Sequence, residues 1–191
     1  MDRDFYARSA LEVARALLGC VLTREGPGEA PVVAGRIVET EAYTGLDDPA
    51  SHAAARIGRT ARNDPLFGPP GTAYVHLNYG IHWCLNAVTG AEGVPSGVLI
   101  RALEPLDGLE TMRGRRDGRD ALTNGPGRLT QALAIGPELQ GHPLDRAPLR
   151  ITPGDPVPDV YAQRSPRIGI SRATDRLYRF TDGRSEWLSR K

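Results

Sequence analysis

The stretch VVAGRIVETEAY, residues 32–43, reads as a strand from Val32 to Thr40 that runs on into Tyr43. Its β-branched residues favour extended structure. Residues 20–23 form a second predicted strand, across the loop EGPGEAP of residues 25–31. The fold is therefore expected to be built on a sheet that includes this part of the chain.

Two carboxylates, Glu39 and Glu41, lie two positions apart on the predicted strand. Alternation places both on one face, about 7 Å apart at the usual rise of a strand. They can mark a solvent-facing strand edge, or a site where one carboxylate takes a proton from water beside its partner. Spacing alone leaves both interpretations open.

The rest of the chain predicts one α+β domain over residues 1–191, with a mostly antiparallel sheet. Ser9 and Glu12 form a capping box for a helix that ends at Gly19. Further strands are expected at 72–77, 81–88, 98–103, 149–152, 167–170 and 177–180, and helices at 109–113 and 126–135, with a short one near 51–55. Residues 45–70 otherwise read as a long loop, which in a compact domain is more often functional than idle.

Composition limits the class of protein. A chain of 191 residues that is 40% hydrophobic can bury its own core, and its formal net charge of +1 does not announce a nucleic-acid partner. No apolar run approaches the length of a membrane span, and the N-terminal residues lack a secretory pattern, so we expect a cytoplasmic protein. Cys20 and Cys84 lack C-x-x-C spacing and are expected to be buried free thiols.

A tight turn at Asn78-Tyr79-Gly80 joins two predicted strands. A tyrosine is unusual at a turn tip. Its ring can fold back onto the surface, or serve as a wedge that fills the hole left by a flipped nucleotide. His76 and His82 flank the turn, and we expect His76 to lie off the face that carries Tyr74. Histidines at such positions are structural, or they stack on bases or contact phosphates.

Basic residues are almost all arginines, because the only lysine in the sequence is Lys191. Two Arg-rich segments, 56–62 and 113–119, are ordinary solvated loops or phosphate clamps; Arg59 and Arg62 are the candidates for DNA backbone contacts. Gly125-Pro126-Gly127 opens a helix that could face an anion. No H-E-x-x-H or cysteine pair is present, so no metal site and no cofactor are expected.

Several segments together resemble the alkyladenine (3-methyladenine) DNA glycosylase family. They cover most of residues 11–135 in one order and are specific as a set. The matching stretches are GRIVETEAYTGLDDPASHA (35–53), RTARNDPLFGPPGTAYVHLNYGIHWCLN (59–86), GVLIRALEPLDGLETMR (97–113), LTNGPGRLTQALAI (122–135) and the shorter RIGIS (167–171).

The resemblance implies a compact α+β domain with a curved antiparallel sheet, surrounding helices and a protruding hairpin that intercalates into DNA. It implies that Glu41 is the general base for an attacking water. It further implies that Arg101, Glu41 and the main chain of Ile168 hold this water. The expected activity is that of a monofunctional glycosylase, which hydrolyses the N-glycosidic bond of alkylated or deaminated purines and leaves an abasic site.

The same resemblance assigns the base pocket. Tyr43 and His52 match residues that line the flipped base, Asn86 matches an asparagine that screens purines, and Tyr79 matches an intercalating tyrosine. His76 stands where the best-known members carry tyrosine at the second stacking wall. Imidazole is smaller and can be protonated, which bears on stacking and on damage preference.

Duplex DNA with a damaged purine is the expected partner, bound by a monomer that needs no protein partner and no membrane. In a prokaryote the enzyme would associate with the nucleoid. Two alternatives stand beside this function. A glycoside hydrolase could use Glu39 and Glu41, although two carboxylates on one strand face do not easily flank a sugar. A non-catalytic module for damaged DNA would use Tyr79 and the arginines and would be indifferent to Glu41.

Overall fold

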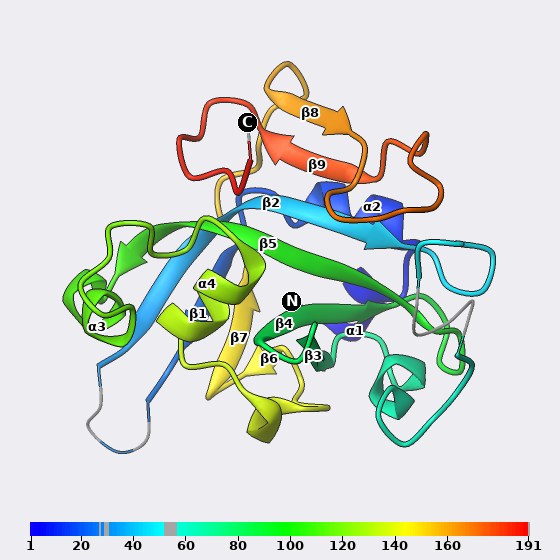
Figure 1. The fold of residues 1–191 in the computed structure, drawn as a ribbon, viewed down its shortest axis with the longest axis horizontal. Coiled ribbons are helices and arrows are strands. Elements are labelled where there is room, and N and C mark those ends of the chain that lie inside the picture. The colour runs from blue at the N-terminus through cyan, green and yellow to red at the C-terminus, as the bar shows by residue number, and fades with distance from the viewer. Residues whose placement is uncertain (27, 29–30, 52–56, 191) are drawn as a thin grey trace.

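The computed structural model describes residues 1–26, 28, 31–51 and 57–190. Its strands form an antiparallel sheet in the order β3–β4–β5–β2–β1–β7–β6, with β9 paired to β2 and β8 paired to β9 (Figure 1). The strands are β1 (Val21–Arg24), β2 (Val33–Tyr43), β3 (Ala73–Asn78), β4 (His82–Thr89), β5 (Ser96–Asp107), β6 (Asp145–Arg146), β7 (Leu149–Thr152), β8 (Ala162–Ser165) and β9 (Arg179–Asp182).

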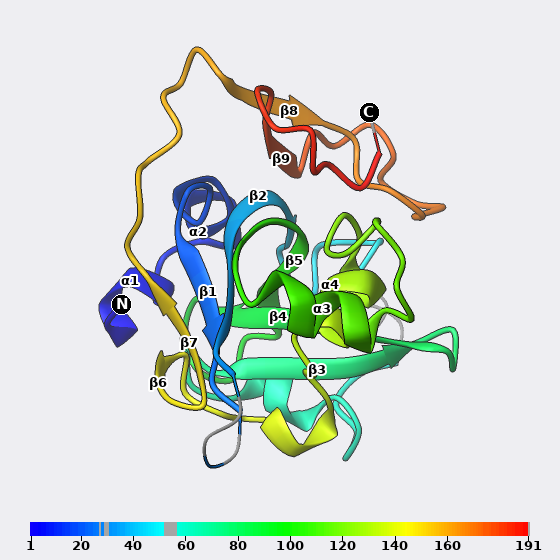
Figure 2. The same ribbon diagram turned by 90° about the vertical axis from the view of Figure 1, so that its left-hand side faces the viewer.

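Short helices surround this sheet, so the expected α+β class with a curved antiparallel sheet is confirmed. They are α1 (Arg3–Tyr6), α2 (Ala10–Ala16), α3 (Leu109–Arg115) and α4 (Pro126–Ala132), with 3-10 helices at Asp64–Phe67 and Pro137–Leu139. In Figure 2, strands β1, β2 and β5 separate α2 from α3 and α4. None of the helices in the described part of the chain is long and apolar enough to cross a membrane.

Strand β2 changes neighbours along its length, and this curls the sheet into a half-barrel. β5 follows one edge of β2, whereas the other edge pairs first with β1, at residues 33–36, and then with β9, at residues 39–41. The register with β5 shifts on both sides of Glu39. Such irregularities bend a strand and strengthen its twist, and Figure 2 shows the resulting curl.

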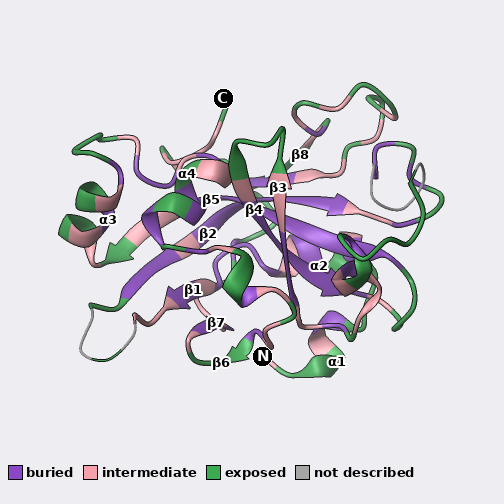
Figure 3. Cartoon of the chain, turned by 60° about the horizontal axis from the view of Figure 1, so that its bottom comes forward, coloured by how far each residue is buried: buried purple, intermediate pink, exposed green. Residues whose placement is uncertain are grey.

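Both faces of β2 are covered, which overturns the interpretation of residues 39–41 as a solvent-facing strand edge. Every residue of β2 is buried except Arg36 and Tyr43, which are partly exposed (Figure 3). Helix α2 packs against the strand, and the Thr40 hydroxyl donates a hydrogen bond of 2.9 Å to the carbonyl of Ala14. Glu39 and Glu41 are fully buried.

The helix predicted from the capping box is confirmed as α2. The Ser9 hydroxyl accepts a hydrogen bond from the Glu12 amide, and the Glu12 carboxylate accepts one from the Ser9 amide at 3.1 Å. Gly19 follows with φ of +92°, and a Cβ atom there would lie 2.0 Å from the carbonyl oxygen of Asp155. Only glycine fits this return of the chain.

The predicted hairpin is confirmed as β3 and β4. Tyr79 and Gly80 have φ of +50° and +70°, and the Ile81 amide donates to the carbonyl of Asn78 at 3.1 Å. Positive φ at both central residues is typical of the tight turns that join antiparallel strands. The hairpin protrudes to the right in Figure 2.

Some predicted elements differ from the structure. Residues 167–170 are not a strand, because the amide of Ile168 donates to a side chain instead of a neighbouring strand. The last strand is Arg179–Asp182 rather than 177–180, and β6 and β8 were missed. Helix α4 ends before residue 135, since Ala134 has φ of +50°. The short helix expected near 51–55 falls largely on residues 52–56, outside the described part of the chain.

The candidate active site

Glu41 lies near the end of β2 and is held by donors from three directions. The Ile168 amide donates to its Oε1 at 2.7 Å. The Tyr43 hydroxyl and Arg101 Nη1 donate to its Oε2 at 2.9 and 3.3 Å. The structure therefore brings together Glu41, Arg101 and Ile168, as expected, and adds Tyr43 to the same carboxylate.

The pKa of Glu41 is raised, because burial removes the carboxylate from water. The charge of Arg101 and the hydrogen bonds from Ile168 and Tyr43 oppose this rise. Burial and the neighbouring Glu41 also raise the pKa of Tyr43 well above its ordinary value, so its hydroxyl stays a donor at neutral pH. A carboxylate with a raised pKa and fixed geometry is suited to accept a proton.

Glu39, the second carboxylate on this face, is occupied by other donors. Its Oε1 accepts from Arg101 Nε at 3.0 Å and from Arg179 Nε at 2.8 Å. Ser189 adds two more contacts, through its hydroxyl to Oε1 and its amide to Oε2. Arg101 thus bridges Glu39 and Glu41, and its own side chain is almost completely buried.

The environments of Glu39 and Glu41 push their pKa values apart. Burial alone would raise the pKa of Glu39, but hydrogen bonds from the Ser189 main chain and from Arg179 outweigh it, and the pKa is lowered. Glu39 is consequently the more acidic of the two carboxylates, and in its ionised form it orients Arg101. Two neighbouring carboxylates with separated pKa values are a common arrangement for distinct roles in acid–base chemistry.

A buried ion pair supports the segment that carries Ile168. Arg167 donates to both carboxylate oxygens of Asp48, and neither side chain has any exposed surface. Arg167 Nη1 also donates to the carbonyl of Ala42 in β2 at 2.8 Å, and the guanidinium lies 4.7 Å from the ring centre of Tyr43. This pair therefore fixes the Ile168 amide against β2 and backs the ring of Tyr43.

His76 and Asn86 come together on the neighbouring strands β3 and β4. The rings of Tyr74 and His76 are stacked, with centres 5.1 Å apart, so the expectation that His76 lies off the face of Tyr74 was wrong. Residues two apart on a strand point to the same face. The Asn86 side-chain amide lies 3.1 Å from His76 Nδ1 and donates to the carbonyl of Tyr74 at 3.2 Å.

Burial lowers the pKa of His76 to about 4, and the positive charge of Arg62 acts in the same direction. The imidazole is therefore neutral near pH 7. Its Nδ1 then accepts from Asn86, which places the remaining ring proton on Nε2. His76 offers a small, uncharged ring at this position.

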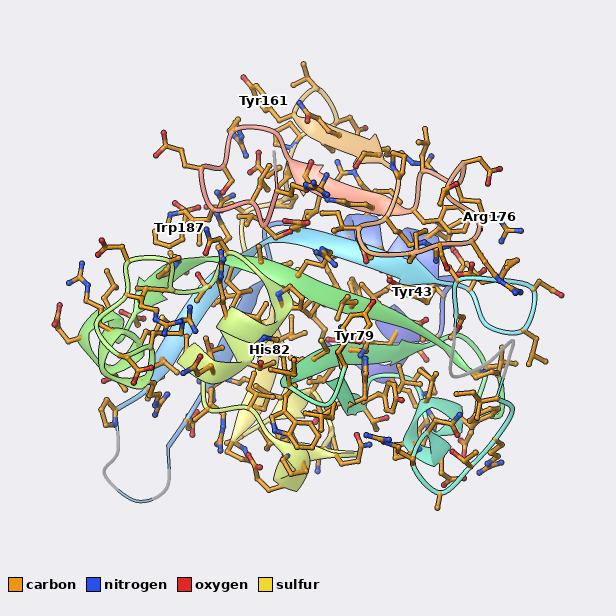
Figure 4. All side chains as sticks on the ribbon, in the orientation of Figure 1. Tyr43, Tyr79, His82, Tyr161, Arg176 and Trp187 are labelled. Atoms are coloured by element: carbon orange, nitrogen blue, oxygen red, sulfur yellow. The ribbon has the colours of Figure 1, made fainter. Side chains whose placement is uncertain are left out.

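Tyr79 is 82% exposed and lies at the tip of the β3–β4 hairpin, beside Ile81, which is 71% exposed. Figure 4 labels Tyr79 and, above it and to the right, Tyr43 at the end of β2. The ring does not fold back into the core. An apolar pair at the tip of a protruding turn is a surface that water solvates poorly.

The structure also places the two arginines predicted to contact the DNA backbone. Arg59 is exposed and pairs with Asp64 at 2.6 Å, whereas Arg62 is exposed near Tyr74 and His76. His52 lies outside the described residues. Within the described ranges, no group of three or more His, Cys, Asp or Glu side chains could hold a metal ion. Cys20 and Cys84 are buried free thiols, as expected.

Sequence reasoning missed the side chains that organise Glu39 and Tyr43: Asp48, Arg167, Arg179 and Ser189. They lie in loops, at a strand end and in the C-terminal segment, with no local motif. Arg167 carried one signal, since it directly precedes Ile168 in the matching stretch RIGIS. The contacts of Arg179 and Ser189 with Glu39 span 140 and 150 residues of chain, which no local pattern reports.

Comparisons with known proteins show which family the chain belongs to. A family model described as methylpurine-DNA glycosylase (MPG) matches residues 4–186. A relative from Carboxydothermus hydrogenoformans is 47% identical over 100% of this chain and 99% of its own length. Relatives from Nitrosospira multiformis and Rhizobium meliloti are 50% and 49% identical, over 98% and 100% of this chain and 92% and 96% of their own lengths. All three are named "Putative 3-methyladenine DNA glycosylase".

The class that follows is a DNA glycosylase, an enzyme of DNA repair that hydrolyses N-glycosyl bonds. Within that class, the chain belongs to the methylpurine-DNA glycosylase family. The resemblance seen in its sequence is thereby confirmed.

Proposed function

We propose that this protein is a monofunctional glycosylase, working as one domain and as a monomer on duplex DNA. It flips alkylated or deaminated purines out of the helix and hydrolyses their N-glycosidic bond, leaving an abasic site. The substrates belong to the class of 3-methyladenine, 7-methylguanine, hypoxanthine and etheno-adenine. The observation that carries this proposal is the buried Glu41 carboxylate with its raised pKa and its bonds to Arg101 and the Ile168 amide.

Glu41 has two tasks in this mechanism. It takes a proton from the attacking water, and its negative charge stabilises the oxocarbenium-like sugar that forms as the base departs. Arg101 and the Ile168 amide keep the carboxylate in place, and Glu39 keeps Arg101 in place. Because Glu41 has no exposed surface in the free protein, this mechanism requires the Tyr43 hydroxyl to give up its hydrogen bond to Oε2 so that water can reach the carboxylate.

The flipped base would stack between Tyr43 and His76, with Asn86 at its edge. Stacking on an aromatic ring returns roughly 1–3 kcal/mol per base, against an unstacking cost of a few kcal/mol. A base alkylated at N3 or N7 is already cationic and leaves readily. A neutral base has to gain a proton as it leaves, and His76, whose pKa is about 4, is a poor reservoir of that proton at pH 7.

The residues available favour hydrolysis by water over attack by an amine. A bifunctional glycosylase forms a Schiff base through an amine, usually a lysine with a lowered pKa. The only lysine in the sequence is Lys191. The amine of Met1 donates to the carbonyl of Ile151 in β7, which β1 separates from β2.

An excision assay separates this function from its alternatives. The enzyme should release the free base from a duplex that contains hypoxanthine or etheno-adenine. A non-catalytic module would bind the duplex and leave the base attached. A glycoside hydrolase would act on sugars, but Glu39 already accepts hydrogen bonds from Arg101, Arg179 and Ser189 and is poorly placed to activate a second group.

Replacement of Tyr79 by alanine should weaken binding to a lesion duplex by about 1–3 kcal/mol, by analogy with lost base stacking. The fluorescence of 2-aminopurine placed beside the lesion, which reports flipping, should fall as well. Val160→Ala is a matched control, because Val160 is 81% exposed on another surface. Unchanged affinity and fluorescence for Tyr79→Ala would show that the ring is only a surface feature.

Excision should proceed unchanged in excess EDTA. The proposed chemistry uses a carboxylate and water, and Arg101 and Tyr43 each donate directly to Glu41. The measurement is the single-turnover rate before and after chelation and dialysis. Loss of activity that zinc or magnesium restores would contradict a metal-independent mechanism.

A further inference from the structure

The C-terminal segment, residues 184–190, contacts β2 through hydrogen bonds between Ser189 and Glu39. The Ser189 amide donates to Glu39 Oε2 at 2.6 Å, and its hydroxyl donates to Glu39 Oε1 at 2.7 Å. The same hydroxyl accepts from Arg101 Nη2 at 3.3 Å. One serine thus contacts both the buried anion and the cation that bridges it to Glu41.

Each of the three guanidinium nitrogens of Arg101 donates to a different residue. Nε donates to Glu39 at 3.0 Å, Nη1 to Glu41 at 3.3 Å and Nη2 to Ser189 at 3.3 Å. The planar fork of an arginine is oriented only when its separate donors are engaged. Without the Ser189 hydroxyl, Nη2 loses its acceptor and the orientation rests on two carboxylates that compete for one cation.

We propose that Ser189 is a positioning residue for the hydrolysis: its hydroxyl holds Arg101 toward Glu41 and tunes the proton affinity of that carboxylate. The inference rests on the proposed role of Glu41 as the general base. The contacts of Ser189 are with Arg101 and Glu39, one step removed from Glu41. Ser189 acts through Arg101 and Glu39.

The direction of the effect follows from the charges. The Ser189 hydroxyl and amide satisfy Glu39, which leaves Arg101 free to share its charge with Glu41. If the hydroxyl is removed, the Glu39 carboxylate accepts one hydrogen bond fewer and attracts the Arg101 guanidinium more strongly. Glu41 then loses stabilisation of its ionised form and also faces a less screened negative neighbour. Both changes raise the pKa of Glu41.

Ser189→Ala, Ser189→Thr and Ser185→Ala test this role. Threonine keeps the hydroxyl. Ser185 is the matched control in the same segment, because its hydroxyl accepts from the Trp187 amide and, among the residues that the structure describes, bonds to neither Glu39 nor Glu41. The substrate is a duplex with 7-methylguanine, a cationic base that leaves without protonation, so the acid limb of the single-turnover rate reports the general base.

In Ser189→Ala, the acid limb of the pH–rate profile should move to higher pH by about half a unit or more. The rate at pH values on that limb should fall, with little change in lesion affinity. Ser189→Thr should restore the limb, and Ser185→Ala should leave it in place. An unmoved or lowered limb in Ser189→Ala would overturn the proposal. An equal upward shift in Ser185→Ala would also overturn it, since the effect would then belong to the order of the whole segment.

A titration independent of excision keeps this proposal separate from the proposed function. In protein labelled with ¹³C at the glutamate carboxyl carbons, the Glu41 resonance is assigned from its absence in Glu41→Gln. Its midpoint should be higher in Ser189→Ala than in the wild type, even if no base is excised. Equal midpoints would refute the role of Ser189, whereas a raised midpoint without any excision would refute only the proposed function.

Discussion

Replacement of Glu41 by glutamine is expected to reduce single-turnover base excision by about two to four orders of magnitude, the usual range for loss of a general base. Glutamine keeps the size of the side chain but cannot accept a proton from water or offset the positive charge of the departing sugar. Affinity for damaged DNA should change little, because Glu41 is buried beneath Tyr43 and Arg101.

The pH dependence gives a second readout for the same variant. Excision of a cationic base by the wild type should decline as pH falls through the raised pKa of Glu41, that is, at a higher pH than an ordinary glutamate would give. The residual excision rate of Glu41→Gln should not show this decline at low pH. Glu92→Gln, which alters an exposed glutamate paired with Arg3, serves as the control. Near-wild-type excision by Glu41→Gln would remove Glu41 as the base.

Replacement of Asp48 by alanine is expected to lower the free energy of unfolding by about 3–5 kcal/mol, the usual cost of leaving one member of a buried ion pair unpaired. Arg167 would lose both of its bonds to the carboxylate, and it has no exposed surface through which water could replace them. Urea or thermal unfolding measures the loss. Asp47→Ala is the matched control, because Asp47 is the exposed neighbour in the same loop.

The contribution of Asp48 also has a defined pH window. Burial opposes its ionisation, but the hydrogen bonds and charge of Arg167 outweigh burial, so the pKa in the folded protein is lowered. A lowered pKa stabilises the fold above the pKa of the unfolded chain, near 4, and this stability is lost as pH falls through the folded value. The wild type should therefore lose more stability than Asp48→Ala below about pH 4. If the free energies of unfolding of the wild type and of Asp48→Ala fell in parallel below this pH, the result would contradict the proposed stabilisation by the ion pair.

Features that depend on neighbouring residues could be predicted from the sequence. The capping box of Ser9 and Glu12 and the turn at Tyr79 each use groups a few positions apart, and both are found in the structure. The common face of Glu39 and Glu41 also follows from the two-residue period of a strand, and Arg101 bridges them there. These rules need no knowledge of the rest of the fold.

Features made by distant segments could not be predicted in the same way. Residues 167–170 look like a short strand, but the Ile168 amide is taken by Glu41, 127 positions away. The burial of β2 on both faces depends on α2 and on the return of β9 and Ser189. A local pattern of apolar and polar residues does not report which charges a later segment will cover.

The most direct test of a water-mediated hydrolysis is the product formed by the wild-type enzyme in a single turnover on a duplex that contains hypoxanthine or etheno-adenine. The account predicts a free base and an intact strand with an abasic site, which breaks only after alkali or heat. Borohydride added during the reaction should trap no covalent complex of protein and DNA. A substantial trapped adduct, or strand cleavage without alkali or heat, would show that an amine attacks the sugar and would contradict the central role of Glu41.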